Sequence, residues 1–247
     1  MKNSLLLSAL IMICLLLFSP DSKAQISVQI GPGLGYSIPM GDYGGSTTDF
    51  YAGTKYGMKS GFNVHAKARV SFIFLSAFGE IGYTSFSGSG NAEETRGSLD
   101  LSQKVFSIKV GPEYQISIPM APVTPYLQGF VSYNAISGSV DIQGVTNVPS
   151  GKYDLASASR IGLGAGVGAI INVMVFKLDV NIQYHAMNIA GKEYKLETVT
   201  SHSRLDNYTS LNDAKDPSYV AGSDDHFIGN DRSIGALELK LTVMFGL

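Results

Sequence analysis

The chain of 247 residues contains no tryptophan and a single cysteine, Cys14. Cys14 lies within an apolar N-terminal run, Leu5 to Phe18, which follows a lysine and precedes Ser22-Lys23-Ala24. This order of positive charge, apolar stretch and small–x–small site is typical of an export signal. We expect residues 1–24 to be cleaved off near Ala24; the alternative, a retained anchor, would need ~20 apolar residues. The remaining chain would lack any thiol, which excludes disulfides, cysteine nucleophiles and thiolate metal sites.

Charged residues are also scarce, at 15% of the chain, and the formal net charge is −2. Loss of Lys2, Lys23 and Asp21 with the signal leaves 16 basic and 19 acidic residues. This slightly acidic balance argues against nucleic acid as a partner, because that role requires a basic patch. No stretch rich in proline, serine or charge divides the chain, so residues 25–247 are predicted to form one domain.

Helical periodicity is absent outside the signal, and alternation with period two takes its place. From Phe176 to Ala186, apolar and polar residues alternate without a break. Side chains on a β-strand point to opposite faces in turn, so this segment predicts a strand with one apolar and one polar face. Its eleven residues are about the length that a tilted strand needs to cross a bilayer.

Alternation of this kind recurs along the chain and predicts eight strands, at residues 26–36, 62–70, 75–84, 106–116, 127–134, 160–171, 176–186 and 237–247. The third is the weakest, because Phe78 falls on its polar face. Pro32 and Pro112 lie inside strands, where a proline removes a hydrogen-bond donor and implies a bulge or a local twist.

The connections between these strands alternate in length. Short links near 72–74, 119–124 and 172–175 separate long ones at about 40–59, 87–103, 137–157 and 187–232. This alternation is typical of bacterial outer-membrane barrels with short periplasmic turns and long external loops. We therefore predict an all-β fold, an eight-stranded antiparallel up-and-down transmembrane β-barrel. Ten strands are the alternative, because residues 194–200 could begin an extra hairpin.

Alternation alone does not say which face meets water. A soluble barrel would bury the apolar faces, whereas a membrane barrel would turn them outward. Two observations favour the membrane barrel. Glycines in series on the polar faces fit a narrow interior, and tyrosines on apolar faces near strand ends fit an aromatic girdle at the membrane interface. The lack of tryptophan argues against it, because tryptophan is usually enriched in such girdles. The girdle is predicted to comprise Tyr36, Tyr83, Tyr114, Tyr133 and Tyr184.

The polar faces carry charges that would point into the barrel. An eight-stranded barrel has an interior that side chains can just fill, and charges in such a space must pair. We expect a structural network of paired charges formed by Lys67, Arg69, Glu80, Lys109, Glu113, Arg160, Lys177, Asp179, His185, Glu238 and Lys240. A proton path or a conducting pore is the alternative interpretation.

Three segments carry a resemblance to a known family: Gly31 to Tyr43 (GPGLGYSIPMGDY), Gly111 to Met120 followed by Pro125-Tyr126-Leu127, and the terminal amphipathic strand. In the first two, a Gly-Pro pair leads after four residues to Ser-Ile-Pro-Met. On these motifs the chain resembles the outer-membrane β-barrel family related to the small OmpA and OmpX barrels, particularly the Bacteroidetes-type, porin-family members. The terminal Leu247 departs from the family's usual final aromatic residue. The resemblance implies the outer membrane of a Gram-negative bacterium, contact with its lipids and insertion by the barrel assembly machinery.

Catalytic motifs are incomplete. The strand segment from Tyr184 to Asn188 is similar to the His-x-Ser-Asn motif of outer-membrane lipid A deacylases, but Met187 occupies the place of the nucleophilic serine. His202-Ser203 and Asp224-Asp225-His226 are interpreted as solvated loop residues. We expect no catalytic residues, no cofactor and no metal. The expected role is structural, or binding of an unidentified extracellular ligand or surface partner through the long loops; a small pore and, less favoured, a lipid-modifying enzyme are the alternatives.

Overall fold

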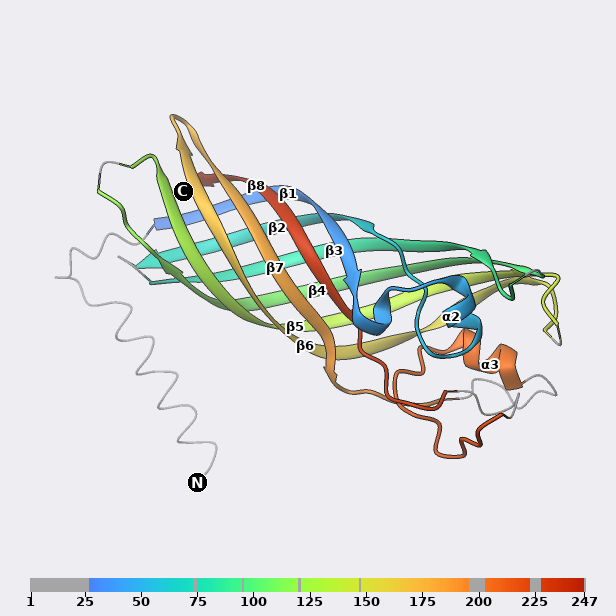
Figure 1. Cartoon of the computed structure of the whole chain (residues 1–247). Coiled ribbons are helices and arrows are strands. Elements are labelled where there is room, and N and C mark those ends of the chain that lie inside the picture. The colour runs from blue at the N-terminus through green and yellow to red at the C-terminus, as the bar shows by residue number, and fades with distance from the viewer. Residues whose placement is uncertain are drawn as a thin grey trace, which may run out of the picture.

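The computed structural model describes residues 27–72, 75–94, 96–119, 121–146, 148–195, 203–222 and 228–246. Eight antiparallel strands form one closed barrel in which each strand pairs with its neighbours in sequence, and the last pairs with the first (Figure 1). The strands are β1 (Ser27–Met40), β2 (Gly61–Phe72), β3 (Leu75–Asn91), β4 (Ser98–Gln115), β5 (Val123–Gln143), β6 (Gly151–Val173), β7 (Phe176–Ala190) and β8 (Gly235–Gly246).

This topology confirms the predicted eight-stranded up-and-down barrel, and each predicted strand overlaps one observed strand. The ten-stranded alternative is wrong for the described part of the chain, because pairing of β1 with β8 closes the ring. The predicted signal, residues 1–24, lies outside the described residues. Among the residues that are described, no helix is long and apolar enough to cross a membrane.

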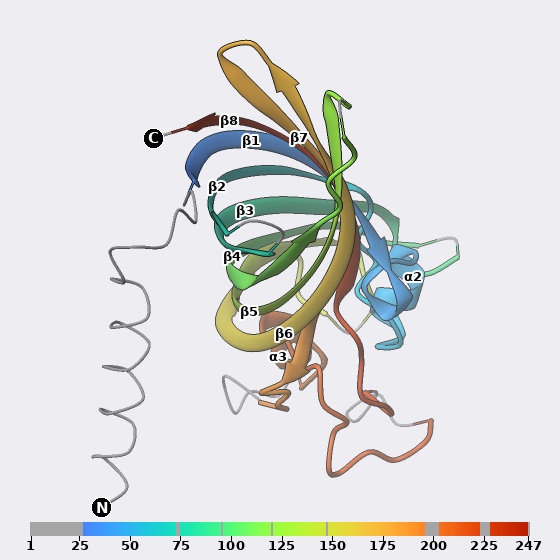
Figure 2. The same cartoon turned by 90° about the vertical axis from the view of Figure 1, so that its left-hand side faces the viewer.

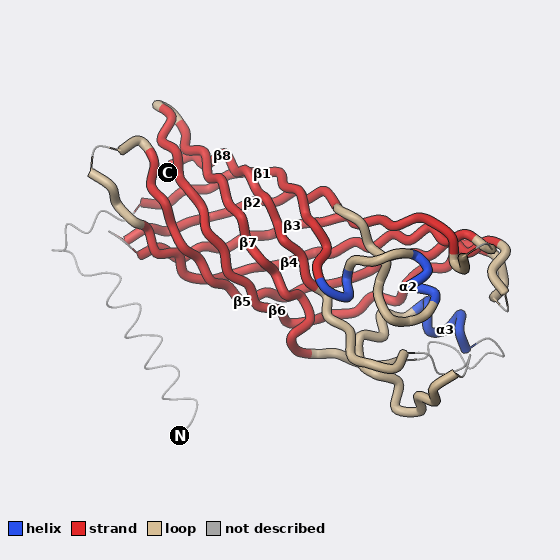
Figure 3. The backbone as a smooth tube through the Cα atoms, viewed as in Figure 1, coloured by secondary structure: helices blue, strands red, loops and turns tan. Residues whose placement is uncertain are grey.

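The loops gather at one end of the barrel, and the short turns lie at the other (Figures 1 and 3). The loop end carries a 3₁₀ turn, η1 (Gly41–Tyr43), and two short helices, α2 (Thr47–Tyr51) and α3 (Ser203–Thr209). In the view along the barrel in Figure 2, α2 lies to the right of the ring and α3 lies at its lower edge, near β6. The start of β1 and the end of β8 lie at the short-turn end, as an even strand number requires.

Two of the expected long loops are mostly strand, which corrects the predicted boundaries 87–103 and 137–157. β3 continues to Asn91 and pairs with the start of β4 at Ser98, and β5 continues to Gln143 opposite β6. Only residues 92–97 and 144–150 connect these strands. We call residues 85–91, 98–105, 135–143 and 151–159 the strand extension. The expected loops 40–59 and 187–232 remain largely outside the strands, although β7 continues to Ala190.

The two Gly-Pro pairs interrupt the strand pairing at equivalent places. Pairing between β1 and β8 skips Gly31 and Pro32, and pairing between β4 and β5 skips Gly111 and Pro112. At both glycines the neighbouring backbone comes close: an added Cβ would lie 1.7 Å from the carbonyl oxygen of Val243 at the first and 1.9 Å from that of Gly129 at the second. The repeated motif therefore needs glycine on the inner face. It releases the proline from pairing on one side only, because Pro32 still lies opposite Ala66 of β2 and Pro112 opposite Ala77 of β3.

The polarity of the barrel reverses along the strands. On β4, outward side chains are apolar from Phe106 down to Tyr114 and polar above, as at Lys104 and Asp100. The inner face switches at the same level, from polar Ser107 to buried Val105. The same change occurs on β3, where outward Tyr83 is followed by outward serines. The barrel thus has an outer apolar band around a polar interior, and above it an extension with an ordinary apolar core.

Candidate functional site

The interior within the apolar band holds nearly all of the predicted charges. Ten of the eleven predicted residues are buried, each at most 4% exposed: Lys67, Arg69, Glu80, Lys109, Glu113, Arg160, Asp179, His185, Glu238 and Lys240. Lys177 is the exception: it is half-buried near the β6–β7 turn, and no ion pair joins it to a described residue. The buried charges fall into three groups along the barrel.

The group nearest the short turns contains two cations and two anions. Lys67 Nζ lies 2.5 Å from Glu113 Oε1 and 2.9 Å from Asp179 Oδ2. Arg69 pairs with both carboxylates, through Nε to Glu113 and through Nη2 to Asp179 Oδ2 at 2.5 Å. The Tyr126 hydroxyl donates to Asp179 at 2.5 Å. Because the charges cancel and the geometry is close, the group links β2, β4, β5 and β7 across the barrel.

The middle group also balances two lysines against two glutamates. Glu238 Oε2 lies 2.6 Å from Lys109 Nζ and 3.0 Å from Lys240 Nζ. Glu80 pairs with Lys240 and lies 3.4 Å from Lys109. His185 Nδ1 is 3.0 Å from the other oxygen of Glu238. Four strands, β3, β4, β7 and β8, meet in this group.

His185 also contacts a serine, which completes a chain that sequence reasoning did not find. Its Nε2 lies 2.8 Å from Ser132 Oγ, while Nδ1 faces Glu238, so the three side chains have the connectivity of a Ser-His-Glu triad. Ser132 is only 4% exposed, and the glutamate is already shared with Lys109 and Lys240. A nucleophile needs room for a substrate and donors for an oxyanion, and the surroundings of this serine are occupied by side chains.

The third group holds a loop to the barrel. Arg160 donates through Nε and Nη2 to both oxygens of Asp213, at 2.8 and 2.7 Å, and pairs with Glu193 at 3.2 Å. The Asn188 amide donates to Asp213 at 2.9 Å. Asp213 is fully buried and lies far from Arg160 in sequence, so nothing in the local pattern could have identified it.

Aromatic rings fill much of the remaining interior. Phe78 and Phe130 pack edge to face with centroids 6.2 Å apart, and Lys67 and Lys109 lie 4.9 and 5.2 Å from their respective ring centroids. The inward glycines of β6 provide the room: a Cβ at Gly164 would lie 2.1 Å from the Phe130 ring, and one at Gly168 would lie 2.3 Å from the Tyr126 ring. Sequence reasoning placed Phe78 on the polar face of its strand but missed the inward rings of Tyr126 and Phe130, although their parity matches that of Gln128.

The predicted girdle tyrosines all point outward and are 41–51% exposed. Register places Tyr83 beside Phe106, and Tyr36 between Phe62 and Leu239, toward the loop end. Tyr114 pairs with Leu75 and Leu127 toward the short turns. Tyr133 donates to or accepts from Ser159 at 2.7 Å, at the level where the outward face becomes polar.

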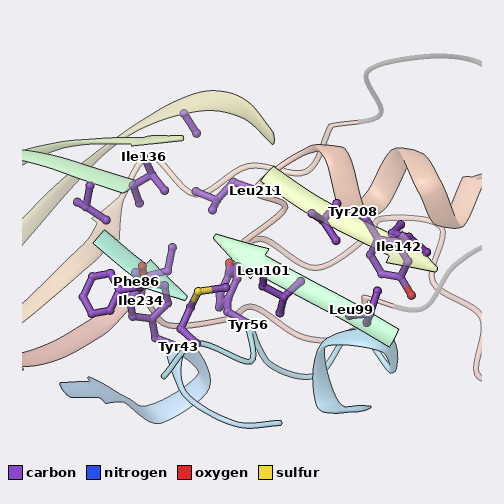
Figure 4. Close-up of a cluster of buried hydrophobic side chains, with 14 of the residues drawn as sticks. Tyr43, Tyr56, Phe86, Leu99, Leu101, Ile136, Ile142, Tyr208, Leu211 and Ile234 are labelled. Carbon is purple, nitrogen blue, oxygen red and sulfur yellow. The ribbon is translucent and has the colours of Figure 1, made fainter. Parts of the chain in front are cut away.

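The loop end is closed by a compact cap, which we define as the described residues of 41–60 and 191–234. Aromatic and aliphatic side chains of the cap pack on the inner face of the strand extension (Figure 4). The Tyr43 ring lies 4.9 Å from that of Phe86, and Phe50 stacks on Tyr208 at 5.1 Å. Burial raises the pKa of the Tyr43 hydroxyl well above its usual value. This core makes the two loops one folded unit.

Hydrogen bonds join the two loops to each other and to β3. Ser233 donates its backbone N–H and its hydroxyl to Asp42 Oδ2, both at 2.9 Å. The Lys59 N–H donates to the Ser87 carbonyl at 2.7 Å, and the Thr47 hydroxyl donates to the Asn91 carbonyl at 2.7 Å. The first loop therefore lies along the outer part of β3.

The loop residues considered for hydrolase or metal chemistry are only partly within the structure. His202, Asp224, Asp225 and His226 lie outside the described residues, and Ser203 begins α3. Within the described ranges, no group of three or more histidine, cysteine or acidic side chains is arranged to hold a metal ion.

No protein-family model matches the sequence, and no curated protein is significantly similar to it. Solved structures with a similar arrangement include Neisserial surface protein A, at 17% identity and a TM-score of 0.44, over 89% of this chain and 96% of that one. A major outer membrane protein from Thermus thermophilus is similar at 14% identity and a TM-score of 0.48, over 89% and 99% of the two chains. The attachment invasion locus protein Ail of Yersinia pestis, solved with a heparin analogue, is similar at 15% identity and a TM-score of 0.37, over 89% and 97%.

Proposed function

We propose that this chain is a non-enzymatic integral protein of the outer membrane of a Gram-negative bacterium, which presents the cap outside the cell. The reversal of polarity along one set of strands carries this proposal. A barrel in water would need polar outward faces throughout, whereas here they are polar only in the strand extension. The apolar outward rows would meet the outer-membrane lipids, and the barrel assembly machinery would insert the chain.

The height of the apolar band supports a membrane location. The row of exposed apolar side chains extends from Phe106 on β4 to Ile116, the residue that follows the end of this strand. Ten residue steps of ~3.4 Å at a tilt of ~40° span about 26 Å along the barrel axis. This value is close to the ~25 Å apolar band of outer-membrane barrels.

The interior favours a structural role over a pore. Its cations and carboxylates pair across the barrel in balanced groups, and aromatic rings fill the space between them. We therefore expect the purified protein to give no stepwise conductance in planar lipid bilayers. Regular single-channel steps that disappear with the protein would favour the pore alternative.

Fractionation and labelling test the location and the orientation together. We expect the protein in the outer-membrane fraction, and recovery as a soluble periplasmic protein would refute the proposal. The only native cysteine, Cys14, precedes the predicted cleavage site. Ser89→Cys in the strand extension should therefore provide the one thiol that reacts with a membrane-impermeant maleimide on intact cells. The matched variant Val175→Cys, in the exposed β6–β7 turn, should react only after cell lysis. The opposite pattern would invert the proposed orientation.

A further inference from the structure

The outward face of the apolar band has a hollow over three neighbouring strands, β4, β5 and β6. Its volume is about 560 Å³, within the ~300–1,000 Å³ range of small-molecule sites, and it is open on the outward side. Three of the residues around it, Val110, Val131 and Leu163, point outward and are 46–51% exposed. The described residues that line the hollow have no polar side chain, so its surface is apolar.

Gly129 leaves the gap from which the hollow arises. It occupies an outward position on β5, between Leu127 and Val131. A Cβ added to Gly129 would meet one atom within 4 Å outside its chain neighbours, the Gly164 carbonyl oxygen at 3.9 Å, and its φ is not positive. Gly111 and Gly164, by contrast, face inward and have no room for a Cβ. Neither packing nor backbone conformation therefore requires glycine at position 129, and a strand glycine is typical of places where a ligand comes close to the backbone.

Strand register extends the hollow sideways. Pro112 lies opposite Ala77 on one side and at the level of Gly129 on the other, and Gly129 pairs with Ala165. Four small outward residues therefore follow one another from β3 to β6, over three strand spacings of ~4.8 Å, or about 14 Å. We call this row the furrow: Ala77, Pro112, Gly129 and Ala165.

Larger apolar side chains border the furrow along both sides. They lie one outward position above and below its floor and are 46–52% exposed: Val110, Val131 and Leu163 toward the loop end, and Tyr114, Leu127 and Val167 toward the short turns. The row ends at Val70 of β2 and at Tyr184 of β7. Val70 lies two pairs from the short-turn end of the β2–β3 ladder, and Tyr184 lies two pairs from the loop end of the β7–β8 ladder. The furrow therefore crosses the apolar band obliquely.

We propose that the furrow holds one acyl chain of a membrane phospholipid. This proposal rests on the membrane location argued above, because the furrow is continuous with the outward face that would meet lipid. Pro112 lies between Val110 and Tyr114, inside the apolar band, where a bilayer presents acyl chains and not headgroups. A linear chain in the furrow would contact the floor and both walls together, and would gain dispersion contacts that a flat outward face does not provide.

Native mass spectrometry tests this proposal. The mature chain is reconstituted in nanodiscs of dioleoyl phospholipids, transferred to a mild detergent and released from the micelle. We expect one retained phospholipid per chain, and equal retention of phosphatidylglycerol and phosphatidylethanolamine, because the lining of the hollow recognises no headgroup. The absence of a retained phospholipid, retention that follows the headgroup, or a lipid-free dimer would each overturn the proposal. Failure of the chain to enter nanodiscs would instead refute the proposed membrane location.

Variants locate the chain in the furrow. Gly129→Leu fills the floor at a position where the added Cβ has room, and the loss of chain contacts should lower retention about fivefold. Ala165→Leu fills the floor on the next strand and should act alike; it decides the test if Gly129→Leu does not fold. The matched control is Gly79→Leu, at an outward glycine where a Cβ meets nothing within 4 Å and which lies outside the furrow, opposite Val110. Unchanged retention in the floor variants, or an equal loss in the control, would overturn the assignment.

Discussion

The outward face of the barrel allows the position of the lipid boundary to be measured. Val110 of β4 is 51% exposed and lies midway along the apolar row from Phe106 to Tyr114. Ser87 of β3 is exposed in the strand extension and pairs with Ser102, eight residues from Val110 on β4. Eight steps of ~3.4 Å at a tilt of ~40° separate the two levels by about 21 Å along the axis. An arginine at position 110 would therefore place its charge in the apolar band, and an arginine at position 87 would place the same charge in water above the band.

We expect Val110→Arg to lower the free energy of unfolding by about 2–4 kcal/mol, the cost of arginine on a lipid face near the bilayer midplane. This is roughly a 30- to 1,000-fold change in the folding equilibrium. Ser87→Arg should change stability by less than about 0.5 kcal/mol, because the side chain remains in water. The measurement is urea unfolding from phospholipid vesicles followed by circular dichroism.

The control Val110→Ala separates loss of the valine side chain from introduction of charge. If Val110→Arg costs no more than Val110→Ala, the outward face does not meet lipid and the barrel is soluble. If Ser87→Arg is as costly as Val110→Arg, the boundary placed at Tyr83 and Phe106 is wrong.

Three further outcomes follow from the interior and the cap. Arg69→Met should destabilise the barrel by about 3–5 kcal/mol in the same urea assay, because Glu113 and Asp179 lose a cation. In the double variant Arg69→Met/Glu113→Gln, part of this stability should be recovered. If the effects of the two single substitutions simply add, Arg69 and Glu113 are not paired. Ser132 should remain unlabelled by a fluorophosphonate in the folded protein, and labelling abolished by His185→Ala would instead reveal an active nucleophile. Hydrogen bonds from the backbone N–H and the hydroxyl of Ser46 lower the pKa of the Asp49 carboxyl in the folded protein. The ionised carboxylate therefore stabilises α2 fully at pH values above the pKa of Asp49 in the unfolded chain, which is about 4. This stabilisation is lost as the pH falls through the lowered pKa of the folded state. Hydrogen exchange of the α2 amides should therefore show a loss of protection on acidification in the parent protein. In the Asp49→Asn variant, protection of α2 should already be lower at neutral pH and should not fall further in this way.

The strands of the apolar band could be predicted because two requirements act on every residue there. Outward side chains there are mainly apolar and inward ones mainly polar, so a segment such as Phe176–Ala186 alternates without exception. Phe78 and Phe130 break the inner pattern because glycines and lysines around them provide the space and the contacts, and such compensation comes from neighbouring strands.

The strand extension could not be predicted in the same way. Its alternation is inverted, with Leu99 and Leu101 inward and Asp100 outward, and its serines and glycines resemble loop sequence. On β6 an irregularity in the register between Ala158 and Leu155 also shifts the parity of the inward side. The alternation that identifies a membrane strand therefore stops at the top of the apolar band, although the strands continue.

The ion pairs were predictable as a set but not pair by pair. Parity identifies which charges point inward, as for Lys109 and Glu238. Which cation pairs with which carboxylate depends on the relative heights of strands on opposite sides of the barrel. These heights follow from the stagger of the closed barrel and cannot be read from any single strand. The Ser132–His185–Glu238 chain is hidden for the same reason, since its members come from β5, β7 and β8.

The contact of the first loop with β3 has a consequence for neighbouring molecules. Ring closure leaves no unpaired strand in the band, but above it β3 rises past β2 and would present free backbone groups at a sheet edge. Such edges recruit other chains and promote aggregation. Lys59 and Thr47 occupy the carbonyls of Ser87 and Asn91, and Gly57 lies so close to Gly88 that a Cβ added to Gly88 would be 2.1 Å from the Gly57 oxygen. The first loop thus covers the edge at which a strand of another copy of the barrel could otherwise pair.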